Sequence, residues 1–142
     1  MRRIFCLLCA FAVGCLGCAV QNNEVQEIPT HNVYEMTITA TQLSNDSVGQ
    51  EWSEMYTCGG ESIYGNKRWT LPIGTTKIVE VEAVITERDK FPDVGNGVLT
   101  VELKDGFETS TVITVVENKG VYRGNQAQWE VVCKVALVGR SL

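Results

Sequence analysis

The stretch Lys77–Glu87, KIVEVEAVITE, decides the fold class of this chain. Its apolar positions are Val79, Val81, Ala83 and Ile85, and the polar residues Glu80, Glu82 and Thr86 stand between them. A period of two residues predicts a β-strand, because successive side chains of a strand point to opposite faces. An apolar face backed by a charged face is typical of antiparallel sheets that have one side in the core and one in water.

The same alternation appears on both sides of this stretch. Clear strands are predicted over 34–41, 98–103 and 127–138, and less regular ones over 52–57, 68–73 and 109–117. Pro72 favours an edge position for its strand, because proline cannot donate a hydrogen bond to a neighbouring strand. No segment shows the 3.6-residue period of a helix. Seven to eight short strands joined by glycine turns predict an all-β antiparallel β-sandwich, with a closed barrel as the alternative.

The composition is that of one ordinary globular domain. The chain has 142 residues, which is within the usual size range of a single domain. Its formal net charge is −5, from 12 Lys+Arg against 17 Asp+Glu. Because an acidic chain is a poor match for a phosphate backbone, we expect no nucleic-acid partner.

The N-terminal residues have the layout of a secretory signal. Arg2 and Arg3 precede an apolar run, and a polar segment begins at Gln21. This order predicts a signal peptide over 1–19, a tether over 20–32 and a single folded domain over 33–142. The protein is therefore expected to be exported. An uncleaved membrane anchor is the alternative, because the apolar run is just long enough to cross a bilayer.

Two cysteines at the end of the apolar run indicate lipid attachment. Cys15 and Cys18 each follow a glycine, as in the lipid-modification signal of bacterial lipoproteins. A cysteine carrying several acyl chains would anchor the protein firmly to a membrane. Cleavage after Ala19 would instead release an unmodified secreted protein.

Only Cys58 and Cys133 lie in the predicted folded domain. An even pair of cysteines in an exported protein predicts one disulfide bond. Two free buried thiols are the alternative.

Residues suited to catalysis are scarce. His31, the single histidine, lies in the predicted tether, so a triad built on it would need that tail to reach the domain. The sequence contains no glycine-rich phosphate-binding loop. We therefore expect a protein without enzymatic activity.

Acidic residues gather in two predicted loops. Asp46 and Glu51 follow the first strand, and Glu87, Asp89 and Asp93 lie between two of the clearest strands. Calcium takes six to eight oxygen ligands from carboxylates, carbonyls and water. If both loops leave the sandwich at the same end, these five residues form a candidate calcium site. The alternative is a set of solvated loop acids, neutralised by neighbours such as Arg88 and Lys90 or bonded to their own turns.

This arrangement resembles the C-two domains, the calcium-dependent phospholipid-binding sandwiches. The segment Tyr34–Leu43 is similar to their opening strand, Asp46 and Glu51 to the acids of their first loop, and Glu87-x-Asp89 with Asp93-x-Gly95 to their later acidic motif. The resemblance covers 33–103. It implies an eight-stranded antiparallel sandwich whose loops bind calcium, lipid or another protein. An immunoglobulin-like sandwich also fits the strand pattern.

Together these features predict an extracytoplasmic, lipid-anchored binding or structural module. Trp52 and Trp69 are candidate partner-binding residues, since tryptophan is enriched at interfaces, although a tryptophan in a sandwich is more often part of the core. The negative charge disfavours anionic lipid as the partner and favours an extracellular or envelope protein or a glycan. A small secreted hydrolase using loop acids and an inert spacer are the alternative functions.

Overall fold

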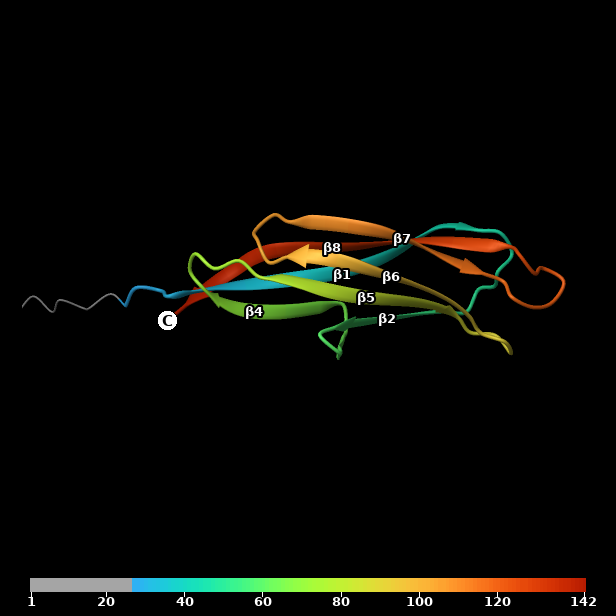
Figure 1. Cartoon of the computed structure of the whole chain (residues 1–142), viewed down its shortest axis with the longest axis horizontal. Coiled ribbons are helices and arrows are strands. Elements are labelled where there is room, and N and C mark those ends of the chain that lie inside the picture. The colour runs from blue at the N-terminus through green and yellow to red at the C-terminus, as the bar shows by residue number, and fades with distance from the viewer. Residues whose placement is uncertain (1–26) are drawn as a thin grey trace, which may run out of the picture.

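A computed structural model describes residues 27–142, in which two four-stranded antiparallel sheets pack face to face (Figure 1). The strands are β1 (His31–Asn45), β2 (Trp52–Cys58), β3 (Glu61–Ile63), β4 (Asn66–Pro72), β5 (Ile78–Glu87), β6 (Asp93–Glu102), β7 (Glu108–Val116) and β8 (Gln126–Ser141). The predicted signal peptide, both lipidation cysteines Cys15 and Cys18, and the first part of the predicted tether lie outside the described residues.

The strands form two separate sheets. The first sheet has the order β4-β1-β8-β7, and the second has the order β3-β2-β5-β6. The predicted antiparallel β-sandwich of seven to eight strands is confirmed, and the closed barrel is not formed. Residues 27–142 contain no helix long and apolar enough to cross a membrane.

The core lies between the two sheets and is built by the alternation seen in the sequence. The inward-facing side chains of β5, β6 and β8 include Val81, Ala83, Ile85, Leu99, Val101, Val131, Cys133 and Val135, all of them buried. The first strand contributes Met36 and Ile38 to the same core. Glutamates and threonines occupy the outward positions, as the period of two residues requires.

Strands β1, β3 and β6 differ most from the sequence prediction. β1 begins at His31, because its first residues pair with both β4 and β8, so the folded domain starts inside the predicted tether. β3 was not predicted, since its three residues are too few to show a period. β6 begins at Asp93, ahead of the predicted strand 98–103, and Asp93 pairs with Glu87 at the end of β5, so both acids belong to strands rather than to a loop.

Pro72 ends β4, an edge strand of the first sheet, as the sequence predicted. At the opposite edge, β6 of the second sheet packs against β7 of the first. Gly95 makes this approach possible, because a Cβ there would stand 2.6 Å from the carbonyl oxygen of Thr114. The sandwich is thus closed along its β6–β7 side.

The two ends of the sandwich carry different parts of the chain. The first described residues and the C-terminus lie at one end, where the N–H of Thr30 donates to the carbonyl of Ser141 at 2.9 Å (Figure 1). The loops 46–51, 88–92 and 117–125 lie at the other end. We call this second end the loop end.

Candidate functional site

The three loops of the loop end are joined by backbone hydrogen bonds. The N–H of Arg88 donates to the carbonyl of Glu51 at 2.6 Å, and the N–H of Asp46 donates to the carbonyl of Gln126 at 2.9 Å. The backbone N–H of Asn118 donates to the carboxylate of Asp93 at 3.1 Å. The first two acidic loops thus leave the sandwich at the same end, which is the condition set for the candidate calcium site, and a third loop joins them.

The backbone of loop 46–51 covers the carboxylate of Glu87. Asn45 closes the loop by donating from Nδ2 to the carbonyl of Gly49 at 2.6 Å and accepting from the N–H of Val48 at 2.9 Å. Val48 is buried and belongs to the hydrophobic core. The carboxylate of Glu87 lies directly against Gly49, where any Cβ would collide with it. Gly49 also has a φ of 136°, which side chains rarely adopt.

Two buried carboxylates lie on adjacent strands at this end of the sandwich. Glu87 and Asp93 are register partners on β5 and β6, and only 2% and 1% of their surfaces are exposed. Asp93 Oδ1 accepts from Asn118 Nδ2 at 2.8 Å, whereas Asp93 Oδ2 and Glu87 Oε2 are buried without a hydrogen-bond partner. Asn32 Oδ1 and Trp129 Nε1 are also buried without a partner, but burying a charged group in this way is more costly.

Burial raises the pKa of Glu87, and the negative charge of Asp89 raises it further. The charges of Asp93 and Glu117 add to the rise, and a backbone hydrogen bond from Glu51 opposes it. No lysine or arginine lies within ion-pair distance of Glu87 or Asp93 among residues 27–142. Glu87 therefore favours a proton or a nearby cation over a bare negative charge.

Glu117 is a third buried acid, and the sequence reasoning missed it. Its Oε1 accepts from the N–H of Lys119 at 3.4 Å. The signal was present, because Ile113, Val115 and Glu117 continue the inward-facing period of β7 by one more step. We call Glu87, Asp93 and Glu117 the buried acids.

The other predicted calcium ligands are placed differently. Asp89 uses Oδ1 to accept the N–H of Phe91 at 2.5 Å and so shapes its own turn. Asp46 and Glu51 are exposed, and the hydrogen bonds that place them are made by their backbones. Within the described part of the chain, no three His, Cys, Asp or Glu side chains are already arranged to hold a metal ion.

Cationic and apolar side chains are exposed on loops 88–92 and 117–125, which we call the outer two loops. Arg88 and Lys90 lie on loop 88–92, and Lys119 and Arg123 lie on the loop that follows β7. The ammonium of Lys119 stands 4.4 Å from the ring centroid of Phe91, and that of Lys90 stands 5.6 Å from it. The loop end thus combines buried acidic side chains with exposed cationic ones.

The two candidate tryptophans pack against the core and are partly buried. Trp52 lies against Trp129, with ring centroids 5.2 Å apart. Trp69 lines a cavity of about 450 Å³ between β4 and the second sheet, together with Lys67 and Lys77. Both rings thus have neighbours within the domain, since Trp52 contacts Trp129 and the ammonium of Lys67 stands 5.7 Å from the ring centroid of Trp69.

Cys58 and Cys133 are both buried, and both thiols are free, so the predicted disulfide is not formed in this structure. Cys58 belongs to β2 of the second sheet and Cys133 to β8 of the first. Burial raises the pKa of Cys133 to about 11, and the charge of a Cys58 thiolate contributes to the rise. The two cysteines thus interact electrostatically across the core.

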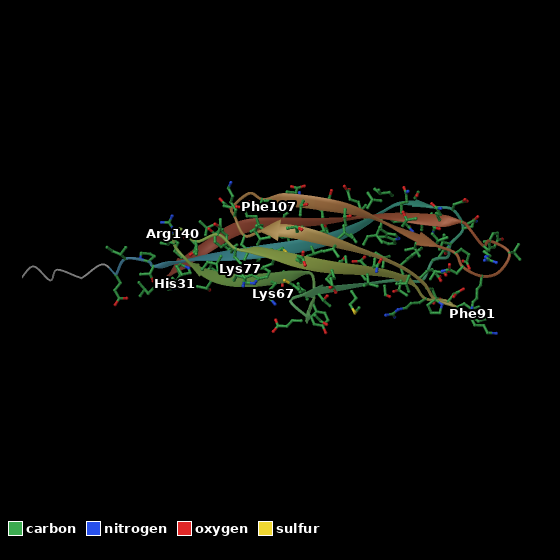
Figure 2. All side chains as sticks on the ribbon, in the orientation of Figure 1. His31, Lys67, Lys77, Phe91, Phe107 and Arg140 are labelled. Atoms are coloured by element: carbon green, nitrogen blue, oxygen red, sulfur yellow. The ribbon has the colours of Figure 1, made fainter. Side chains whose placement is uncertain are left out.

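His31 lies at the end opposite the buried acids, where its Nδ1 hydrogen-bonds the hydroxyl of Thr30 at 2.8 Å (Figure 2).

No family model, no curated protein and no solved structure matches this chain. The resemblance to C-two domains stays a prediction from the acidic motifs.

Proposed function

We propose that this protein is an exported, lipid-anchored binding module without enzymatic activity, and that its loop end binds calcium. The observation that carries the proposal is the pair of facing carboxylates, Glu87 and Asp93, each buried and each with an oxygen that lacks a partner. A divalent cation would satisfy both oxygens and remove the repulsion between them.

The placement of the two ends suits a tethered module. The predicted tether enters the domain at β1, and β1 runs from that end to the loop end (Figure 1). A strand of 15 residues spans roughly 45 to 50 Å at about 3.3 Å per residue. An anchor before residue 27 would therefore hold the loop end at the far side of the domain, facing a partner.

Calcium fits the donor set better than softer metals do. Every candidate ligand is an oxygen, and calcium tolerates irregular arrangements of carboxylates, carbonyls and water. Glu87 and Asp93 would form the base of the site, while Glu117 and Asp89 would have to turn toward them. Asp46 and Glu51 would act through the loop that covers the site.

Two observations favour binding over catalysis. Glu87 and Asp93 are both buried, and the carboxylate of Glu87 lies against Gly49, which leaves no room for a substrate to approach it. The imidazole of His31 is at the opposite end of the domain. A hydrolase that uses these acids is the less favoured alternative, and an inert spacer would bind no ion at all.

A calcium titration followed by thermal unfolding tests the proposal. Calcium raised to a few millimolar should increase the melting temperature, because a ligand of the folded state stabilises it by RT ln(1 + [L]/Kd). Glu87→Gln should abolish the increase, and Glu80→Gln, an exposed position on the same strand, should retain it. Absence of a shift in the unmodified protein, or an equal shift in both variants, would refute the calcium site.

A further inference from the structure

The outer two loops of the loop end carry a local positive charge on an acidic protein. Arg88, Lys90, Lys119 and Arg123 are exposed there, and Asp89 is the single acid of loop 88–92 and segment 118–124. The whole chain has a net charge of −5. None of the four cations forms an ion pair with another of the residues 27–142. We call these two segments the cationic loops.

The cationic loops also expose apolar side chains. Val121 is 95% exposed, Tyr122 59% and Phe91 47%. Val121 and Tyr122 lie on the loop between β7 and β8, and Phe91 lies near the tip of the loop end in Figure 2. Exposed aromatic and aliphatic groups beside arginines form the mixture that is enriched at protein interfaces.

The two loops form one surface. Lys119 on one loop covers the Phe91 ring of the other at 4.4 Å, and Asn118 bonds Asp93 at the base. A hollow of about 200 Å³ lies between them, lined by Lys90, Phe91, Pro92, Asp93, Asn118 and Lys119. A side chain of a partner therefore has a place to insert, with cations on its rim.

We propose that the cationic loops are a docking surface for an acidic protein segment that also carries apolar side chains. This inference rests on the proposed binding function and names the partner of the same end. Four unpaired cations select negative charge. Val121 and the rings of Phe91 and Tyr122 would make favourable apolar contacts with the side chains of a protein partner. An acidic polysaccharide lacks such side chains. An anchored domain points this surface away from its own membrane, which disfavours lipid.

Binding to defined polyanions tests the partner class. The full chain carrying Cys15→Ser and Cys18→Ser, which prevents lipid attachment, is titrated with a fluorescent random copolymer of glutamate and tyrosine in the presence of a calcium chelator. Polyglutamate, polygalacturonate and vesicles of phosphatidylcholine with phosphatidylglycerol are the comparison probes. The copolymer should bind most tightly, and its affinity should fall as salt is added.

Charge-reversal variants locate the surface. Lys119→Glu with Arg123→Glu should weaken copolymer binding by about tenfold or more, a change of about 1.4 kcal/mol. The matched control is Lys77→Glu with Arg140→Glu, two cations at the opposite end of the domain, and it should change affinity less than about twofold (Figure 2). Val121→Ser with Tyr122→Ser should abolish the preference for the copolymer over polyglutamate.

The outcomes separate this inference from the calcium site. Tighter binding to vesicles or to polygalacturonate, no binding to any probe, or equal losses in the two charge-reversal variants would each overturn the proposed partner. Because the titration is carried out with a chelator, copolymer binding can succeed where the calcium response fails. A calcium response without copolymer binding would leave the ion site standing and refute the docking surface.

Discussion

Gly95 shows how one residue sets the distance between the two sheets. A Cβ at this position would lie 2.6 Å from the carbonyl oxygen of Thr114 and 2.7 Å from Cγ2 of Ile113. Gly95→Ala should therefore lower the free energy of unfolding by about 1 to 3 kcal/mol, the usual cost of overpacking. Gly139→Ala is the control, because no heavy atom lies within 4 Å of its added Cβ. Urea denaturation of both variants checks the difference, and equal stabilities would contradict the close approach.

Glu87 should make stability depend on pH. Its pKa is raised in the folded state by burial and then by the charges of Asp89, Asp93 and Glu117. The folded protein thus binds more protons than the unfolded chain between the ordinary carboxyl pKa and the raised value. Stability should therefore fall as pH rises through that interval. Glu87→Gln should flatten this part of a melting-temperature profile measured without calcium, and Glu80→Gln should leave it unchanged. A profile that is identical in all three proteins would show that Glu87 ionises at no cost.

At the scale of elements, β2 and β8 each bring one buried cysteine to the core between the sheets. Because we propose that the protein is exported, and an exported chain meets an oxidising compartment, we predict that Cys58 and Cys133 become joined there. The bond would close a segment of 74 intervening residues and add roughly 4 kcal/mol by restricting the unfolded chain. Thiol labelling under denaturing, non-reducing conditions, followed by peptide mapping, should find neither Cys58 nor Cys133 labelled in the mature chain. Two labelled cysteines would show that the free thiols of this structure are also the state of the mature protein.

At the scale of the whole molecule, the direction of the loop end depends on how the chain is anchored. The glycine-cysteine pairs at Cys15 and Cys18 predict a mature chain that begins at one of them and carries lipid. Mass spectrometry of the membrane fraction should detect an acylated N-terminal cysteine. Cys15→Ser with Cys18→Ser should move the protein from the membrane to the soluble fraction, whereas Cys133→Ser should leave it at the membrane. An unmodified chain that begins after Ala19 would instead establish plain secretion.

The sequence by itself determined the sandwich. Alternation of apolar and polar residues is a local property, since each strand buries one face whatever its neighbours are. It therefore identified the inward side chains of β5, β6 and β8, and the missing N–H of Pro72 separately indicated an edge strand. It did not find β3, because three residues are too few to repeat a pattern.

Only the tertiary structure decided which acids come together. Glu87 and Asp93 pair across a hairpin and are near in the sequence, whereas Glu117 on the other sheet and Gly49, which lies against Glu87, come from distant segments. Asp46 and Glu51 have the same chemistry but point into solvent. Burial and repulsion depend on distances between strands, and these distances are fixed by sheet order, register and packing. Local residue patterns contain none of these three quantities, so the grouping of the buried acids, and the position of the cationic loops beside them, emerged only in the folded chain.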